Sequence, residues 1–548
     1  MKLNYKRTIF VGLAFFLISA FWQAYDNAIP LTLTNKFGLS QTASGIIMAL
    51  DNILALFMLP LFGTLSDKCR SPRGRRTPFI ITGTVLAAVM LVSLSFIDHA
   101  QLKNISAATA IDDPAAMHSI YDAQADAQLM TPDGDSFVLQ ETFTREEFGA
   151  ISSQLRWEDG TLLRNDNGEA YTLTARFSPD QQETVAAQNE NEVFTNPHYT
   201  DYVIPARQAY AHTQTMGAPT MLILFVCLLL MVLISMAIFR SPAVALMPDV
   251  TVKPLRSKAN AIINLMGTAG GILVLGLGIV FATGSLKNAV MSYRLYFGVI
   301  AALMLTALAV FLWKVKEPRF VREMQEKEKE LGITDEEPVE VGEKQSLGRK
   351  RRRSLLFLLA SIVLWFFAYN AVTSKYSVYA GNILNKDYNL TLMIAQGAAI
   401  VSYLPVGFIA SRVGRKKTIL AGIVMLTTAF AVAGFLRQDS PTWLMNAMFA
   451  LAGIGWATIN VNSFPMVVEM CKGSDVGKYT GIYYTASMAA QTLTPMVSGL
   501  LMDKLGMTVL FPYAAVFAGL AFLTMLFVFH GDNKPTAKKG LEALDVED

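Results

Sequence analysis

The segment 63–77, GTLSDKCRSPRGRRT, is the most informative part of the chain for its fold, because a variant of it recurs in the second half at 407–418, GFIASRVGRKKT. Both copies lie between two long apolar runs. A second pair of segments corresponds in the same way, with Asp249 in the first half matching Glu469 in the second. Repetition on this scale indicates a chain built from two similar halves. In membrane proteins, such repeats predict a transporter whose substrate site lies between the halves.

The composition places most of the chain in a membrane. Of its 548 residues, 53% are hydrophobic and 16% are charged, and the mean hydropathy is +0.38. Soluble domains carry about 25% charged residues, so these values exclude a string of soluble globules. The three cysteines are too few for a disulfide framework or a cysteine metal site. The phosphate-binding loop of an ATP-driven pump is absent from the sequence. We therefore expect a transporter that is not an enzyme and needs no cofactor.

The apolar runs are long enough for membrane-spanning helices, which need about 20 residues each. They lie near 8–33, 42–65, 78–98, 218–248, 259–284, 292–313, 355–381, 391–411, 417–437, 442–469, 479–502 and 508–530. This pattern predicts an all-α polytopic membrane protein with twelve transmembrane helices in two six-helix repeats. The predicted divisions are 1–98 and 218–313 for the N-terminal half, 99–217 for an insert, 314–353 for a linker, 354–530 for the C-terminal half and 531–548 for a tail.

The basic residues of the short loops predict the orientation. If the N-terminus is cytoplasmic, the inner loops and the N-terminal stub hold 17 Lys and Arg, whereas the short outer loops hold six. Cytoplasmic loops are the ones enriched in these residues, so both termini are expected inside a plasma membrane. The first apolar run continues into Gln23 and Asp26 rather than a cleavage site, which predicts a retained helix and not a signal peptide.

Two stretches are too polar to lie in the membrane. The insert 99–217 has 18 acidic and six basic residues, and this topology places it outside the cytoplasm. Alternating apolar residues at 136–139 and 171–177, next to Asp-Gly and Asn-Gly pairs, predict strands and hairpins and hence a mixed α/β or β-rich insert. Its four histidines are expected to be solvated surface residues. The linker 314–353 predicts a helix that ends in a basic cluster at the membrane surface, with no role in nucleic-acid binding.

The repeated loop predicts a cytoplasmic gate. A glycine lets two helices approach closely, and a carboxylate at a helix end can lie near the positive N-terminus of a neighbouring helix. The arginines can pair with carboxylates in contacts that hold one face shut and break when it opens. Ordinary positive-inside anchoring would explain the arginines but not the rest of the motif. The gate residues are expected to be Gly63, Asp67, Arg75, Arg76, Asp249, Arg415 and Glu469.

These motifs resemble the loop signature of the major facilitator superfamily. The longer string 60–80 is similar to that of the glycoside–pentoside–hexuronide cation symporters, in the branch of sucrose transporters and animal proton-coupled sugar carriers. The resemblance covers the spans but not the insert, and it implies symport of a sugar or glycoside with a cation. Plant sucrose carriers have an arginine where this chain has Val244, and the two span-2 acids of melibiose-type sodium carriers are Ala55 and Leu59 here. A proton is therefore expected as the coupling ion in preference to sodium.

Charged residues inside spans are costly, so each is a functional candidate. Asp26 in the outer half of span 1 and Asp51 in span 2 are expected at ~10 and ~14 Å from the outer surface, given a rise of about 1.5 Å per residue. Two carboxylates at one level would make one of them a proton acceptor near neutral pH. Capping or hydrogen bonding to Asn27 and Asn52 is the structural alternative. We expect Asp51 to carry the proton and Asp26 to bind proton or sugar.

Polar and aromatic side chains in the spans suit a neutral, polar ligand. The candidate substrate-binding residues are Trp22, Gln23, Tyr25, Asn27, Asn52, Arg240, Tyr369, Asn370, Lys375, Asn460 and Gln491. Packing between helices is the alternative role for the aromatic residues, and Arg240 could pair with a carboxylate instead of substrate. We expect a monomeric importer in contact with the lipid bilayer. Efflux of organic cations or drugs, and a ligand sensor that uses the insert without transport, are the alternative functions.

Overall fold

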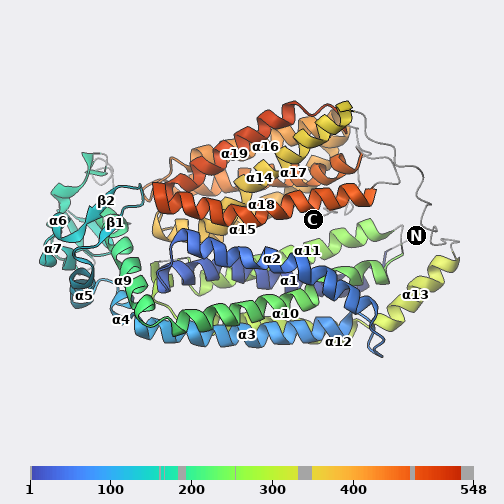
Figure 1. Ribbon diagram of the computed structural model, residues 1–548, viewed down its shortest axis with the longest axis horizontal. Helices are drawn as coiled ribbons and strands as arrows, with labels where there is room; N and C mark the ends of the chain where they lie inside the picture. Colours follow the sequence, from blue (N-terminus) through green and yellow to red (C-terminus); the bar gives the residue numbers. More distant parts are fainter. Residues whose placement is uncertain are drawn as a thin grey trace.

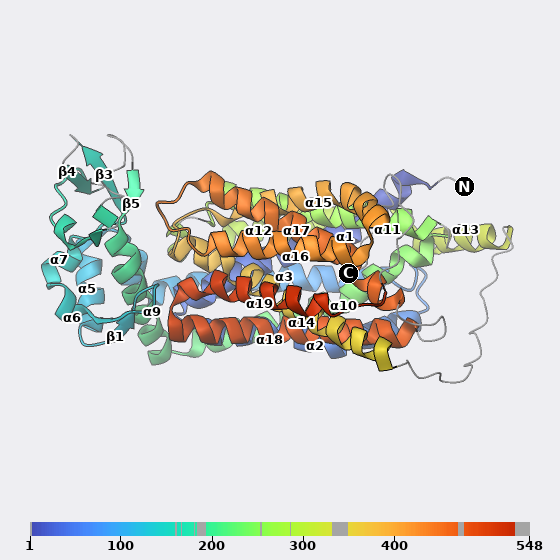
Figure 2. The same cartoon turned by 90° about the horizontal axis from the view of Figure 1, so that it is seen from above.

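The computed structural model is a long helical bundle with a small domain at one end (Figure 1). It describes residues 3–158, 162–165, 167–179, 181–182, 193–252, 255–284, 286–330, 349–469 and 476–531. The end of the bundle that carries the small domain is called the insert end, and the opposite end, next to α13, is called the linker end. The two ends are viewed again in Figure 2, which is turned by 90°.

Each apolar run predicted as a span corresponds to one helix of the structure, with bounds that differ by a few residues. In the N-terminal half these are α1 (Tyr5–Leu31), α2 (Gln41–Asp67), α3 (Thr77–Asn104), α10 (Thr220–Val250), α11 (Arg256–Val280) and α12 (Arg294–Lys314). In the C-terminal half they are α14 (Arg349–Asn382), α15 (Tyr388–Val413), α16 (Arg415–Ala433), α17 (Thr442–Glu469), α18 (Val476–Leu505) and α19 (Leu510–Leu526). Short helical turns η1 (Thr32–Lys36), η5 (Leu286–Ala289) and η7 (Met507–Val509) lie at the insert end. Within the described residues, ten helices are long and apolar enough to cross a membrane, and α15 and α18 lie outside that set.

Each half has a hydrophobic core of its own. In the N-terminal half, α1 packs on α11 and α3 packs on α10; in the C-terminal half, α17 packs on both α15 and α16, and α14 packs on α19. Phe21 and Leu229 are fully buried in the first core, and Trp365 and Phe511 in the second. The halves meet where α2 lies along α18 and α11 along α15. Figure 1 shows the C-terminal half in yellow to red above the N-terminal half in blue to green.

The insert is a folded α/β domain with a hydrophobic core of its own. Its helices are α4 (Ser106–Thr109), α5 (Pro114–Gln124), α6 (Leu139–Thr142), α7 (Arg145–Gly149) and α9 (Ile204–Gly217), with short turns η2 (Thr174–Arg176) and η3 (Tyr199–Val203). Strands β1 (Gln128–Met130) and β2 (Ser136–Val138) form a hairpin, and β3 (Gln154–Glu158) pairs with β4 (Leu162–Asn165) and β5 (Val193–Thr195) in an antiparallel sheet. Phe148, Leu155 and Tyr199 are buried at its centre.

Two expectations for the insert are wrong. Residues 171–177 form no strand but a loop with the 3-10 turn η2, because the N–H groups of Arg176 and Phe177 bond to the carbonyls of Leu173 and Thr174 in the same segment instead of to a neighbouring strand. His198 is not a solvated residue. It is buried, and its Nδ1 lies 2.8 Å from the Tyr171 hydroxyl. Burial lowers the pKa of His198 to about 4, so the ring is neutral at physiological pH.

The linker forms a helix as predicted in its first part. Helix α13 (Glu317–Glu330) follows α12 and projects at the linker end. The basic residues 349–353 form the first turn and a half of α14. Residues 331–348 and the tail from 532 lie outside the described residues.

Candidate functional site

A central cavity of about 1130 Å³ lies between the two halves. Helices α1, α10 and α11 line it from the N-terminal half, and α14, α15, α17 and α18 line it from the C-terminal half. The wall reaches Asn260, near the start of α11, and Tyr403, in the second half of α15. The cavity therefore extends from the middle of the bundle toward the linker end.

Five of the predicted substrate residues line this cavity together with Asp26. They are Trp22, Gln23, Asn27, Arg240 and Tyr369. The α1 residues lie on one helix face because Ser19, Trp22, Gln23, Asp26 and Asn27 are spaced three or four residues apart. The Arg240 guanidinium lies over the Trp22 ring, 5.5 Å from its centroid. An aromatic and a cationic side chain from two helices thus meet at the cavity wall.

The carboxylates of Asp26 and Asp51 lie in the same electrostatic neighbourhood. Asp26 interacts with Asp51 and Arg240, and Asp51 interacts with Arg240 in turn. Asp51 does not line the cavity but accepts hydrogen bonds from the Asn52 backbone N–H at 2.6 Å and from Asn52 Nδ2 at 2.7 Å. Asn52 therefore bonds a carboxylate instead of facing the cavity. The structure brings together the pair of acids that the sequence singled out, and Arg240 interacts electrostatically with both.

The C-terminal half contributes a flat aromatic surface. The Tyr369 and Trp456 rings stack with centroids 3.8 Å apart and an interplanar angle of 5°. Trp456 belongs to α17, and its indole is held edge-on by Phe366 of α14. This stack, together with Trp22 across the cavity, provides apolar faces of the kind that pack against the C–H surface of a ligand.

Sequence reasoning missed a polar stripe on α11 and a glutamine on α15. Asn260, Asn264 and Thr268 line the cavity at intervals of four residues, which is one face of a helix. Gln396 donates a hydrogen bond through Nε2 to Gln23 Oε1 at 2.6 Å, so it bridges the two halves within the cavity. The signal was present in the sequence, because three polar residues at this spacing interrupt an otherwise apolar span.

Other predicted substrate residues lie away from the cavity wall. Tyr25 is buried in the N-terminal core. Lys375 is buried where α14 meets the start of α2, and its Nζ donates to the Gln41 carbonyl at 2.7 Å. Asn370, Asn460 and Gln491 are half-buried and do not line the cavity. The spacing of residues along the sequence could not distinguish these positions from those on the cavity wall, since residues of one span can face the cavity, the core or the partner half.

At the linker end the predicted gate residues of the N-terminal half form one ionic cluster. Arg76 pairs with Asp67 at 2.5 Å and with Asp249 at 2.8 Å, and Arg75 pairs with Asp249 at 2.6 Å. At Gly63, an added Cβ would lie 2.9 Å from Ser241 Oγ, as expected for a close approach of α2 and α10. Arg415 begins α16 in the other half, and the side chain of Glu469 lies outside the described residues.

The carboxylate at the N-terminus of α3 is Glu317, not a residue of the repeated loop. Its two oxygens accept hydrogen bonds from the backbone N–H groups of Arg75, Arg76 and Thr77 and from the Thr77 hydroxyl, at 2.7–3.2 Å. A buried carboxylate there satisfies the free N–H groups of the first helical turn. Glu317 lies in the predicted linker 314–353, where a single Glu among many charges carries no signal of this role.

The comparison with protein families decides what kind of protein this is. Residues 11–110, 209–399 and 384–545 match the Major Facilitator Superfamily, and these segments cover well over half of the chain. The chain belongs to the Major Facilitator Superfamily. It is therefore a multi-pass membrane protein of a transporter family. Residues 111–208 of the insert fall between the matched segments of this major facilitator chain.

Relatives with curated names are similar to short parts of the transporter. The MFS-type transporter ppzB of Metarhizium rileyi is 24% identical over 26% of this chain and 28% of its own length. Sucrose transport protein SUT3 of Oryza sativa subsp. indica is 30% identical over 13% of this chain and 15% of its own. The chain thus matches less than a third of the length of either relative. The resemblance predicted from the loop motifs is confirmed at the level of the superfamily.

Solved structures of a xylose transporter and a nucleoside transporter are similar in fold to this chain over almost its whole length. The inward open conformation of the xylose transporter XylE from E. coli superposes with a TM-score of 0.54 at 13% identity, covering 99% of both chains. A point mutant of the nucleoside transporter NupG superposes with a TM-score of 0.51 at 12% identity, covering 95% of this chain and 100% of NupG. At these identities the similarity establishes the fold alone.

Proposed function

We propose that the transporter is a symporter that carries a sugar or glycoside into the cell together with a proton. The observation that supports this most directly is the lining of the central cavity. Amide side chains of Gln23, Asn264 and Gln396 face the same space as the stacked Tyr369 and Trp456 rings. Amides can exchange hydrogen bonds with hydroxyl groups, and aromatic faces pack on the C–H faces of a sugar ring.

The volume of the cavity is compatible with this substrate. Small-molecule sites have volumes of about 300–1,000 Å³, and this cavity is slightly larger. Two buried donors near it, Trp22 Nε1 and Asn370 Nδ2, have no hydrogen-bond partner within the part of the chain that the structure describes. Buried donors are normally paired, so a hydroxyl-rich ligand would supply what these groups need.

Coupling to a proton rests on Asp26, Asp51 and Arg240. Two carboxylates that share a low-dielectric site cannot easily both be ionised, so one of them exchanges a proton readily. Arg240 interacts electrostatically with both, and it would favour the ionised form of whichever acid it approaches in a given state. Because Asp26 also lines the cavity, substrate binding and protonation act on the same group of charges.

The topology proposed here is twelve spans, including α15 and α18, in a plasma membrane, with both termini cytoplasmic. The insert end is then outside the cell and the linker end inside. The basic loops at the linker end support this orientation. The domain divisions, the cytoplasmic gate and a monomeric state belong to the same proposal.

Uptake into proteoliposomes under an imposed pH gradient tests the function, with a panel of radiolabelled mono- and disaccharides. We expect accumulation of at least one sugar, loss of accumulation in Asp51→Asn with exchange preserved, and no effect of Asp122→Asn at the surface of the insert. Asn264→Leu and Gln396→Leu should raise KM by about 2- to 13-fold each, as expected for the loss of one neutral hydrogen bond. Thr306→Val on α12 is the matched control outside the cavity.

Efflux of an organic cation is the second candidate, because Asp26 and the aromatic rings could hold a positive charge. Arg240 already places a cation over Trp22, which favours the neutral substrate. Failure of every sugar to accumulate, with either a proton or a sodium gradient, together with export of a lipophilic cation, would establish this alternative.

A further inference from the structure

The insert is attached firmly to the N-terminal half. The chain enters the insert from α3 and leaves it through α9 into α10. Helices α3 and α9 are joined by a hydrogen bond from Gln101 Nε2 to Thr215 Oγ1 at 2.8 Å. Gln101 Nε2 also donates to the Lys36 carbonyl of η1 at 2.9 Å, and Gln208 Nε2 of α9 donates to Asn35 Oδ1 of η1 at 3.0 Å. Gln101, Lys36 and Asn35 are all buried. Because these contacts are short, buried and local, the insert and the N-terminal half must move as one body.

The tip of the insert reaches across to the C-terminal half. The turn between β1 and β2 lies on the loop between α18 and η7, where the Thr508 N–H donates to the Pro132 carbonyl at 3.2 Å. Gly134 and Gly506 face each other there with φ of 100° and 91°. A Cβ on Gly134 would lie 2.5 Å from the Leu505 carbonyl oxygen, so the two backbones touch without room for a side chain.

Further contacts tie the insert to the same half. Asn385, in the turn between α14 and α15, donates to the Thr195 hydroxyl at the end of β5. Arg437, which follows α16, lies 3.7 Å from Asp133 in the β1–β2 turn. The insert therefore contacts three separate connections of the C-terminal half: those after α14, after α16 and after α18.

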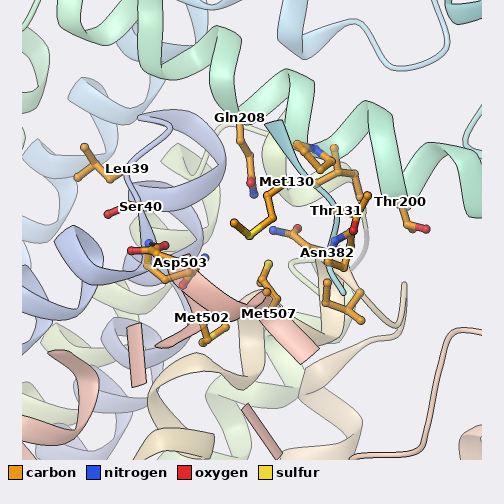
Figure 3. A pocket seen from close by; sticks show the side chains of 16 residues that line it. Leu39, Ser40, Met130, Thr131, Thr200, Gln208, Asn382, Met502, Asp503 and Met507 are labelled. Carbon is orange, nitrogen blue, oxygen red and sulfur yellow. Dashed lines mark hydrogen bonds between the residues drawn. The ribbon is translucent and has the colours of Figure 1, made fainter. Parts of the chain in front are cut away.

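A small pocket marks the place where all three parts meet. It has a volume of about 150 Å³, and Figure 3 shows Met130 and Gln208 of the insert, Ser40 of the N-terminal half and Asn382 and Asp503 of the C-terminal half around one space. Beside it, Asn35 exchanges hydrogen bonds with Asn382, and Gln208 Nε2 donates to Asn35 Oδ1 at 3.0 Å. The insert thus covers the joint between the halves and takes part in it.

We infer that the insert is a clasp that holds the insert end of the transporter closed and that must release the C-terminal half before this end can open. Since the insert moves with the N-terminal half, separation of the halves at this end has to break the contacts of the β1–β2 turn and of Thr195. The clasp lowers the free energy of the closed state and so helps to set the population of the open one. This inference requires alternating opening of the two ends but not a particular substrate or coupling ion.

A pair of glycine substitutions tests the clasp. Gly134→Val places a side chain against the Leu505 carbonyl and should push the tip off the C-terminal half. Gly168→Val is the matched control, because Gly168 also has a positive φ, of 80°, in a turn of the insert but has no atom within 4 Å of an added Cβ. Both variants are made in the full-length protein, with the native cysteines replaced, in lipid nanodiscs without substrate.

Distances between nitroxide labels give the readout. Leu295 at the start of α12 and Trp443 at the start of α17 are 67% and 68% exposed and report on the separation of the halves at the insert end. Asp126 and Trp443 report on the tip of the insert itself. We expect Gly134→Val to increase the population with a longer Leu295–Trp443 distance by about tenfold, which corresponds to ~1.4 kcal/mol. Gly168→Val should match the wild type.

Two results for Gly134→Val would overturn the inference. One is a longer Asp126–Trp443 distance in Gly134→Val with an unchanged Leu295–Trp443 distance, since the tip would then lift without freeing the halves. The other is no change in either distance, since the tip would then not press on the C-terminal half. Equal opening in Gly168→Val would assign the effect to general strain in the insert and would contradict the clasp as well.

Discussion

At the insert end the polar contacts run between the two halves, whereas at the linker end the ionic cluster lies within the N-terminal half. Asp503 of α18 accepts hydrogen bonds from the N–H groups of Gln41 and Thr42 at the start of α2, each at 2.7 Å. Arg76 binds Asp67 and Asp249 of its own half. A carboxylate therefore accepts hydrogen bonds from a helix N-terminus at both ends: Asp503 from α2 at the insert end, and Glu317 from α3 at the linker end. Only Asp503 belongs to the opposite half from the helix that it binds. We expect contacts at the insert end to control opening and those at the linker end to control stability.

The largest effect is expected where the helices touch through backbone. An added Cβ on Gly45 of α2 would lie 2.0 Å from the Pro495 carbonyl oxygen of α18, and neither backbone can move without separating the halves. Gly45→Ala should therefore shift most molecules to the longer Leu295–Trp443 distance, measured as above. Gly298→Ala, where an added Cβ meets no atom within 4 Å, should leave that distance unchanged. A closed insert end in Gly45→Ala would mean that α2 and α18 do not form the joint.

Loss of the carboxylate that bridges the joint should have the next largest effect. Asp503→Ala removes three hydrogen bonds to α2, including the one from the Thr42 hydroxyl at 2.5 Å. Hydrogen bonds to charged groups contribute about 1.5–3 kcal/mol each, so even one of them predicts a change of more than about tenfold in the open population. The neighbouring exposed residue provides the control, Lys504→Ala, with no change expected in the label distance.

At the linker end, substitution should lower stability and leave the distance at the insert end unchanged. Glu317→Gln keeps the shape of the side chain but removes the charge that accepts four donors at the start of α3, and it should cost about 1–3 kcal/mol. Thermal unfolding in detergent would show a lower midpoint than in the wild type or in Glu326→Gln on the exposed side of α13. A longer Leu295–Trp443 distance in Glu317→Gln would remove the distinction between the two ends.

The smallest effect is a dependence of the clasp on external pH. Burial, with the nearby charges of Asp133 and Asp439, raises the pKa of Asp201 to about 7. The protonated form of Asp201 is thus favoured in the docked insert, and this contribution to docking is lost as the pH rises through about 7. Asp439 belongs to the C-terminal half. Its contribution to the raised pKa of Asp201 is therefore present only while the insert is docked on that half.

Titration of the label distance from pH 5 to pH 8 measures that dependence. In the wild type, the open population should rise a few-fold between pH 5 and pH 8. In Asp201→Asn, whose side chain stays neutral, the open population should stay low and should change less with pH. Asp122→Asn, at an exposed ion pair elsewhere in the insert, should follow the wild type. A profile in Asp201→Asn as steep as that of the wild type would assign the titration to another group.

The sequence predicted the helices well and the site only in part. Apolar runs of about 20 residues located every helix of the bundle. The chemistry of Trp22, Gln23 and Asp26 marked them as candidates, and the structure places them on the cavity face of α1. Lys375 shows the limit of this reasoning. As a charge inside a span it was a sound candidate for substrate binding, but its amine is bonded to Gln41 across the joint. Glu317 shows the opposite error, since a charge in a linker carried no signal although it caps α3.

Residue order was sufficient to establish the membrane location, the helical bundle, the twofold repeat and the superfamily, because these depend on composition and on local motifs. Three-dimensional packing was needed to show which polar residues share the cavity, that the carboxylates of Asp503 and Glu317 close helix N-termini, and that the insert lies across both halves. Contacts of this kind join residues distant in the chain, such as Pro132 and Thr508. Their strength depends on the close approach of two backbones, which no pattern within a single segment records.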